Sequence, residues 1–201
     1  VGLRSDKWEE TELNLDSETN GGIHAGKVDD TETLPRVSIT RTLENNSIAY
    51  FTSSKGYEPG GLNNGVPYTD GSGNRLLGSF GKEEATQNEL GWKGTINDGK
   101  TSIAIAYFDI DYKDRAFQVV APNPGGPGLI EYVTNIGDSE QNGLEFEITT
   151  KATDNLTLSL AAGWVDSEFT EGTVLADGTD LSGLTPSGTI DNGFLIAADY
   201  A

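Results

Sequence analysis

Cysteine and methionine are both absent from this sequence of 201 residues, and histidine occurs once. Without cysteine, the chain forms neither a disulfide framework nor a thiolate metal site or nucleophile. The single histidine, His24, does not complete the usual zinc ligand set by itself, and no G-x-S-x-G elbow accompanies it. We therefore expect no enzyme and no cofactor, and we assign no catalytic, cofactor-binding or metal-binding residue.

Basic residues are also scarce. Lysine and arginine total 13 against 32 aspartates and glutamates, which gives a net charge of -19. Nucleic-acid binding needs clustered lysine and arginine to neutralise phosphates, so we expect no nucleic-acid partner. A surplus of carboxylates has an ordinary interpretation as well, because it keeps a chain soluble and repels nonspecific partners.

Long apolar runs are missing too. Hydrophobic residues make up 35% of the chain, and no stretch approaches the roughly 18 consecutive apolar residues of a transmembrane helix. A membrane β-barrel remains possible, because only alternate residues of its strands face lipid. The sequence starts at Val1 without a signal-peptide pattern, so we expect either a removed leader or a segment of a larger protein.

What the sequence does contain is strand alternation. Residues 156–164 read LTLSLAAGW, with leucine, alanine and tryptophan on one face and small or polar residues on the other. The apolar residues Leu144, Phe146 and Ile148 alternate with Glu145 and Glu147 in the same way. Other segments show the same alternation more weakly. Together they predict eight antiparallel strands, at residues 2–13, 37–40, 47–54, 88–96, 101–117, 143–149, 156–164 and 194–200.

Short and long connections alternate between these strands. Short turns are expected at residues 43–46, 97–99 and 153–155, where Asn and Asp-Gly pairs tolerate positive φ. Long polar connections are expected at roughly 14–34, 56–83, 118–140 and 166–190. Outer-membrane barrels have short periplasmic turns and long extracellular loops. Aromatic residues near strand ends are candidates for interfacial girdles or for ordinary core positions: Phe108, Tyr112, Trp164 and Tyr200.

Several short motifs follow one another along the chain. Two of the more specific ones are SSKGYEPGGLN at residues 53–63 and ELGWKGTINDGKTSIAIA at 89–106. YFDIDYKD at 107–114 and NIGDSEQNGLEFE at 135–147 follow, and PRVSIT and GLRSD nearer the start are less specific. In this order and spacing the motifs resemble those of TonB-dependent receptor barrels. The chain resembles an internal segment of such a barrel, covering residues 1–201, with plug domain and C-terminal strands absent.

The resemblance implies an all-β, antiparallel, up-and-down transmembrane barrel segment of about eight strands, open or partial. It implies a place in the outer membrane of a Gram-negative bacterium and a part in uptake of a scarce nutrient, most often an iron–siderophore complex. The implied partners are outer-membrane lipid, a plug domain, TonB and the nutrient ligand. Glu145 and Glu147 are expected to face the lumen. No residue is assigned to substrate binding.

Two alternatives remain open at this point. One is a small, self-closed outer-membrane barrel with a structural or adhesive role, which requires pairing between the first strand near Leu3 and the last near Ile196. The other is a secreted acidic β-sandwich that binds calcium or carbohydrate, which requires two packed sheets. The acidic residues Asp109, Asp111 and Asp114 depart from the EF-hand pattern. The Gly-rich segments 70–74 and 177–180 are expected to be exposed turns.

Overall fold

A computed structural model describes the chain except for residues 17–21, 45, 70–74, 123–126 and 176–177. In the described part every regular element is a β-strand, and no helix there is long and apolar enough to cross a membrane. The strands are β1 (Gly2–Asp16), β2 (Gly22–Thr42), β3 (Ile48–Glu58), β4 (Gly61–Thr69), β5 (Arg75–Phe80), β6 (Glu83–Ile96), β7 (Thr101–Pro122), β8 (Leu129–Lys151), β9 (Leu156–Phe169) and β10 (Asn192–Tyr200).

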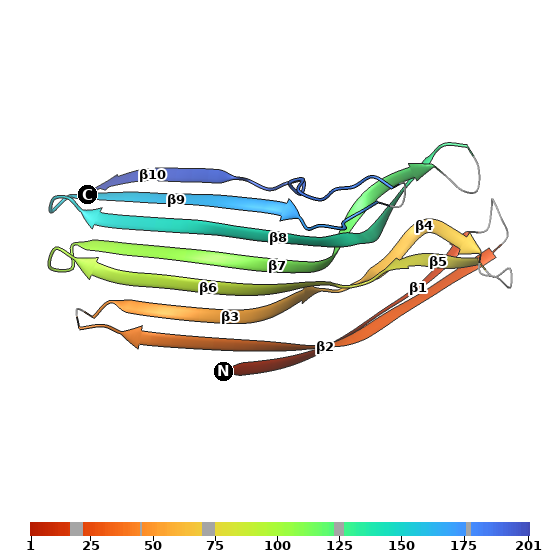
Figure 1. Ribbon diagram of the computed structural model, residues 1–201, viewed down its shortest axis with the longest axis horizontal. Helices are drawn as coiled ribbons and strands as arrows, with labels where there is room; N and C mark the ends of the chain where they lie inside the picture. Colours follow the sequence, from red (N-terminus) through yellow and green to blue (C-terminus); the bar gives the residue numbers. More distant parts are fainter. Residues whose placement is uncertain (17–21, 45, 70–74, 123–126, 176–177) are drawn as a thin grey trace.

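Eight of the ten strands form an antiparallel meander, which confirms the predicted architecture. β1, β2, β3, β6, β7, β8, β9 and β10 each pair with the next in that order. β4 and β5 form a hairpin between β3 and β6, in the region expected to be a loop. In Figure 1 this hairpin lies between the tall β1–β2 and β7–β8 hairpins.

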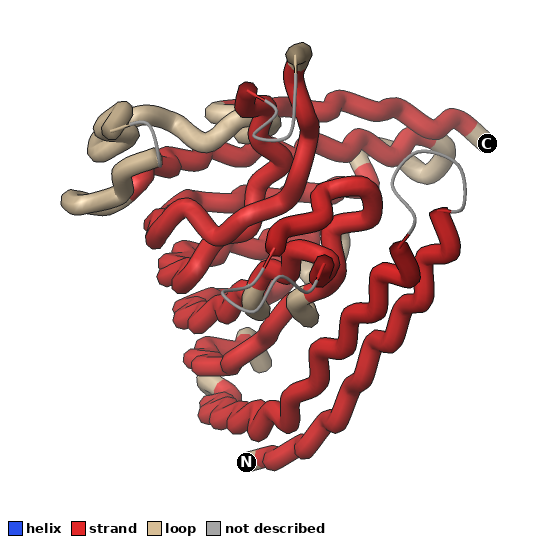
Figure 2. The backbone as a smooth tube through the Cα atoms, turned by 90° about the vertical axis from the view of Figure 1, so that its right-hand side faces the viewer, coloured by secondary structure: helices blue, strands red, loops and turns tan. Residues whose placement is uncertain are grey.

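The sheet is open. Figure 2 shows a curved sheet whose two ends, marked by N and C, stay apart. In the described part of the chain β1 pairs only with β2, and β10 only with β9. A barrel closed between Leu3 and Ile196 is therefore not formed, and a single sheet is not the two-layered sandwich of the second alternative.

One end of the sheet carries short turns and the other carries long hairpins, as expected. The short turns connect Thr42 to Ile48, Ile96 to Thr101 and Lys151 to Leu156. Asn97, Asp98 and Gly99 all have positive φ, at 54°, 53° and 83°, which explains the Asn-Asp-Gly sequence there. At the opposite end the expected loops at 14–34 and 118–140 are wrong in part, because β1, β2, β7 and β8 extend far into them.

The two faces of the meander differ sharply in chemistry. Register places apolar side chains in four successive rows on one face, which we call the apolar band. The row nearest the long hairpins contains Ile39, Phe51, Leu90, Tyr107, Leu144 and Trp164, and the last contains Ile96, Thr101, Thr150, Leu158 and Ala198. From Tyr107 to Thr101 the rows span about 20 Å at 3.4 Å per residue, comparable with the expected lipid-facing band.

The opposite face, which we call the polar face, contains Glu145 and Glu147, as expected from their alternation with Leu144 and Phe146. Aromatic rings lie flat against glycines here. A Cβ built on Gly143 would lie 2.5 Å from Phe108 Cζ and 2.5 Å from the Trp164 carbonyl oxygen. Gly143 therefore leaves room for Phe108, which is only 9% exposed.

We predict that Gly143→Ala destabilises the folded protein by about 1–3 kcal/mol, because the added methyl overpacks a contact that includes fixed backbone. Gly163→Ala is the matched control, since the nearest atom to its added Cβ is 4.0 Å away. Urea unfolding of the intact protein refolded in detergent measures both. Equal midpoints for the two variants would contradict the packing described for Phe108.

Candidate functional site

A groove of about 490 Å³ runs along the polar face over β2, β3 and β6. Its lining mixes hydroxyl, amide and charged side chains with one isoleucine: Arg36, Thr40, Ile48, Tyr50, Thr52, Ser54, Gln87, Glu89 and Lys93. A smaller hollow of about 120 Å³ shares Tyr50, Glu89 and Lys93 with it and continues to Glu145 and Glu147 on β8. This polar wall is the first candidate site.

Tyr50 and Glu89 form the centre of the wall. The Tyr50 hydroxyl donates to Glu89 Oε1 at 2.6 Å, and Gln87 Nε2 donates to Glu89 Oε2 at 3.3 Å. Tyr50 lies over Gly91, where a Cβ would come within 2.3 Å of its ring. Glycine at position 91 is therefore needed to lay the ring along the sheet and present its hydroxyl to the carboxylate.

The wall has more carboxylates than cations. Lys93 Nζ lies 5.6 Å from the Tyr50 ring centroid, and its neighbours across β7 and β8 are Ala104 and Glu147. The small alanines at 104 and 106 leave the carboxylates of Glu145 and Glu147 exposed. Three glutamates against one lysine make this part of the wall a complement for a basic segment rather than for an anion.

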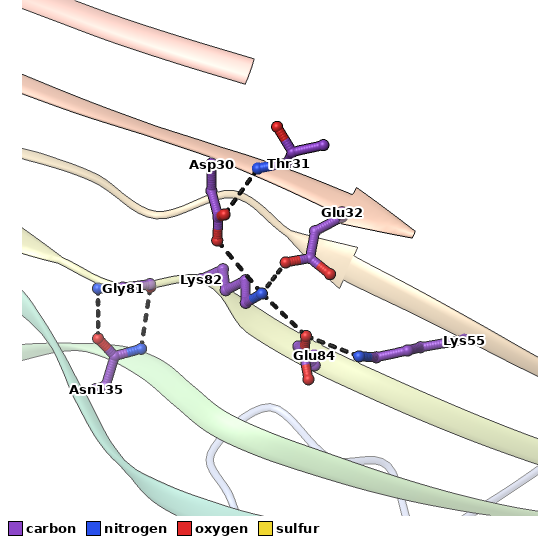
Figure 3. A network of polar contacts seen from close by, with 8 residues as sticks. All are labelled: Asp30, Thr31, Glu32, Lys55, Gly81, Lys82, Glu84 and Asn135. Atoms are coloured by element: carbon purple, nitrogen blue, oxygen red, sulfur yellow. Dashed lines mark hydrogen bonds and ion pairs between the residues drawn. The ribbon is translucent and has the colours of Figure 1, made fainter. Parts of the chain in front are cut away.

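A second polar centre lies where the β4–β5 hairpin returns to β6 (Figure 3). Lys82 Nζ makes ion pairs with Asp30 Oδ2 at 3.3 Å, with Glu84 Oε1 at 3.1 Å and with Glu32. Glu84 Oε1 also accepts from Lys55 Nζ at 2.8 Å. Glu32 is only 5% exposed, so Lys82 supplies the countercharge that its buried carboxylate needs.

These contacts shift the ionisation of groups that lie beyond the apolar band. Partial burial lowers the pKa of Lys82, but hydrogen bonds with Glu84 and Asp30 outweigh it and raise the pKa overall. The hydrogen bond from Lys55 lowers the pKa of Glu84, burial acts the other way, and Lys82 adds to the lowering. The pKa of Asp30 is lowered by the Thr31 backbone N–H and by Lys82. Lys82, Glu84 and Asp30 are therefore charged at neutral pH.

Two asparagines fasten the hairpin to β8 by imitating strand pairing. Asn63 Nδ2 donates to the Val133 carbonyl at 2.7 Å, while the Val133 N–H donates to Asn63 Oδ1 at 2.8 Å. Asn135 does the same with Gly81. The Gly81 N–H donates to Asn135 Oδ1 at 2.6 Å, and Asn135 Nδ2 donates to the Gly81 carbonyl at 3.1 Å. Each amide therefore satisfies a donor and an acceptor that lack a strand neighbour at that point.

The paired glycines of the KGYEPGG segment, residues 55–61, have a structural role. A Cβ on Gly60 would lie 2.3 Å from the Phe80 carbonyl oxygen, and a Cβ on Gly61 would lie 2.9 Å from the Phe80 ring and 3.1 Å from Glu10 Oε2. Paired glycines are needed where β3 turns into β4 and the hairpin closes on itself. The motif thus positions the base of the β4–β5 hairpin.

The structure corrects some predicted positions. Trp164 lies on the apolar band, as a girdle position requires. Phe108 and Tyr112 are wrong as girdle residues, because both lie on the polar face, where the Tyr112 ring packs 4.6 Å from the Arg115 guanidinium carbon. Tyr200 lies at the short-turn end of β10 and is exposed.

The remaining candidates do not converge on a site. His24 was expected in a loop but belongs to β2, opposite Asn14. Asp109 and Asp111 lie on the face of the apolar band, beyond its outermost row, and Asp114 uses its backbone N–H to bond Asp138. Residues 70–74 and Asp177 lie outside the described residues, whereas Asp180 accepts from the Ser182 N–H in a turn. No group of three or more potential metal ligands occurs in the described ranges.

Sequence reasoning missed Asn63, Lys82 and Asn135 as organising residues. Each bonds a partner far away along the chain, so no local spacing marks it. Asn63 and Asn135 do lie inside the segments 53–63 and 135–147 that resemble the receptor family. Those segments were the available signal.

The family described as TonB dependent receptor-like, beta-barrel, matches residues 1–200. The metal-pseudopaline receptor CntO of Pseudomonas aeruginosa is 24% identical over 183 residues, which are 90% of this chain and 23% of that receptor.

Two solved structures share the fold. The siderophore receptor PiuA of Acinetobacter baumannii matches with a TM-score of 0.71 at 20% identity, over 98% of this chain and 28% of that one. The ferric yersiniabactin uptake receptor FyuA of Yersinia pestis matches with a TM-score of 0.67 at 19% identity, over 98% of this chain and 27% of that one. The chain spans about a quarter of the length of these relatives.

We predict that Lys82→Met destabilises the hairpin base by about 2 kcal/mol, because it leaves the buried Glu32 carboxylate without a countercharge. The figure is below that of a fully buried pair, since the Lys82 side chain is 29% exposed. Hydrogen exchange in the intact protein, followed at the peptide that covers residues 78–84, measures the change. The double variant Lys82→Met with Glu32→Gln is expected to recover most of the protection, and no recovery would contradict the pairing.

We also predict that acid loosens the hairpin base. The pKa values of Glu84 and Asp30 are lowered by folding, so their contribution is complete above their ordinary values of 4.5 and 3.8 and is lost as pH falls through the folded values. Lys82 stays charged throughout this window, because its pKa is raised. Hydrogen exchange corrected for intrinsic rate is expected to show falling protection at 78–84 below about pH 4.5, with residues 101–107 unchanged. Constant protection at both segments down to pH 3 would refute it.

Proposed function

The chain belongs to the TonB-dependent receptor-like β-barrel family, and on that premise we propose that it forms part of the wall of an outer-membrane receptor that imports a chelated metal. We propose an iron–siderophore complex as the substrate. The observation that carries the proposal is the family match over residues 1–200, combined with an open antiparallel sheet that has one apolar and one polar face. The relatives are transport receptors rather than enzymes.

The apolar band supports placement in the outer membrane of a Gram-negative bacterium, where members of this family reside. Its large apolar side chains are exposed in the structure, including Phe51, Leu90, Leu144 and Trp164. A lipid environment covers such a surface, and the paired strands satisfy the backbone groups that lipid leaves unbonded. The short turns would then face the periplasm and the tall hairpins the outside.

The polar wall supports a plug domain as the partner inside the barrel. Glu89, Glu145 and Glu147 face the same side and have Lys93 as their neighbouring cation. A plug segment bearing arginine or lysine would complement them, and arginine would do so with paired hydrogen bonds. In this proposal residues 1–201 are a partial barrel domain, and the plug domain, the remaining strands and the TonB contact belong to other parts of the intact receptor.

The names of the relatives support a metal chelate as cargo. FyuA is a ferric yersiniabactin uptake receptor, PiuA is a siderophore receptor, and CntO is a metal-pseudopaline receptor. Two of these names specify siderophores or ferric siderophores, which is why we propose iron first. A different metal bound to an organic chelator is the second candidate, favoured by the name of CntO.

Uptake by the intact receptor tests the proposal. The receptor, produced in a Gram-negative host that lacks its own siderophore receptors, is expected to import 55Fe given as a panel of ferric siderophores, and deletion of tonB is expected to abolish import. Nickel and zinc chelates supplied to the same cells test the second candidate. Import of these chelates alone would overturn the iron assignment, and import that persists without TonB would overturn the receptor class.

A further inference from the structure

Two tall hairpins rise beyond the apolar band on the side of the long connections. The β1–β2 arm comprises residues 8–16 and 22–34, and the β7–β8 arm comprises residues 114–122 and 129–138. In the part of the chain that the structure describes, no strand of one arm pairs with a strand of the other. Figure 1 shows β4 and β5 between them. We call residues 59–63 and 78–84, the base of this hairpin, the crosspiece.

The crosspiece is bound to the β7–β8 arm through both of its strands. Asn63 pairs with the backbone of Val133, and Gly81 pairs with the side chain of Asn135. Asn135 Nδ2 also donates to the Asp114 carbonyl at 2.6 Å, which joins β7 to the same point. These bonds have the donor–acceptor geometry of a strand ladder, so they resist shear as well as separation.

Glu83, which also belongs to the crosspiece, adds a charged contact with the β7–β8 arm. Glu83 Oε2 accepts from the Ala116 N–H at 3.1 Å, and Glu83 Oε1 lies 3.3 Å from Arg115 Nε. The Arg115 guanidinium is further held between the rings of Tyr112 and Phe117, with its central carbon 4.6 Å and 4.9 Å from the two centroids. Charge and stacking together fix the end of the crosspiece on β7.

The opposite side of the crosspiece is bound to the β1–β2 arm. The Leu62 N–H donates to Glu10 Oε2 at 3.2 Å on β1, and Lys82 pairs with Asp30 and Glu32 on β2. Gly61 lies against Glu10 so closely that a Cβ would contact Oε2 at 3.1 Å. The crosspiece therefore touches both arms within a few residues, and its glycines leave no side chain to act as a spacer.

We propose that the crosspiece is a mechanical coupler, which makes the β1–β2 arm and the β7–β8 arm move as one body. Clamps on both sides of a short, closed hairpin base transmit displacement of one arm to the other, since no free linker lies between them. The coupling is a property of the fold and holds for any cargo. Its consequence for transport, that cargo touching one arm repositions the other, rests on the proposed function.

Distances between the arms test the coupling. The chain contains no cysteine, so Thr11→Cys on β1 and Val120→Cys on β7 introduce one spin label in each arm of the intact receptor, with any cysteine elsewhere replaced by serine. Double electron–electron resonance without cargo is expected to give one narrow distance distribution. Adding Asn63→Ala and Asn135→Ala is expected to widen it at least twofold. Asn142→Ala is the matched control, because Asn142 lies on the same strand as Asn135 but on the face of the apolar band, and it is expected to leave the distribution unchanged.

A second pair of labels distinguishes loss of coupling from loss of structure. Gln118→Cys and Leu129→Cys report distance within the β7–β8 arm, which the two alanine substitutions are expected to leave unchanged. An inter-arm distribution of equal width with and without the asparagines would overturn the proposal. Widening of both distributions would overturn it as well, because the asparagines would then hold the arm itself together. Since no cargo is used, neither result depends on the success of the uptake experiment.

Discussion

The structure is organised by the pairing of backbone donors and acceptors between neighbouring strands. Within a bilayer no water replaces a missing hydrogen bond, so strands cross only in a continuous ladder. Inside the apolar band the registers from β3 through β6, β7, β8 and β9 have no shift and supply that ladder, whereas β7 and β8 shift register only beyond the band, between Tyr112 and Ala116. Once the register is set, the period of two places Leu144 on the apolar band and Glu145 on the polar face.

The sheet has little core of its own. Among described residues the large buried apolar side chains are Leu34, Phe108 and Phe169, far fewer than a soluble domain of this length contains. The polar face instead uses flat aromatic–glycine contacts, such as Tyr50 over Gly91 and Phe108 over Gly143. These contacts need no second layer of side chains. The environment on each face, lipid outside and a plug inside in the proposed receptor, replaces the missing layers.

Alternation predicted the strands inside the band, and it failed where both faces meet water. Residues 118–122 and 129–140 remain in β7 and β8, yet polar and apolar residues do not alternate there: Val119 and Val120 are adjacent, as are Leu129 and Ile130, so no period of two marked a strand. For residues 101–107 the opposite problem arose, since Ile103 and Ala104 are both apolar. Only pairing with Ile148 and Glu147 decided which one faces outward. The face of Phe108 and Tyr112 followed from the same register.

The crosspiece could not be predicted from sequence in the same way. Asn63 and Val133 are 70 residues apart, and Gly81 and Asn135 are 54 apart, so the bonds between them leave no periodic trace. The motif at residues 53–63 marked the region by family resemblance, but its physical role became visible only when Gly60 and Gly61 were found against Phe80 and Glu10. The motif therefore located the segment in the sequence, and the contacts of Gly60 and Gly61 explained why it has glycines there.

Collision accessibility along β8 measures whether one face of this sheet meets lipid and the other does not. Single spin labels at each position from Leu144 to Thr149, in the intact receptor reconstituted into liposomes, are exposed to oxygen and to a water-soluble nickel chelate. Oxygen accessibility is expected to be high at Leu144, Phe146 and Ile148 and low at the positions between them. An accessibility profile without this alternation, or one with the glutamates on the oxygen-accessible face, would contradict the assignment of the two faces.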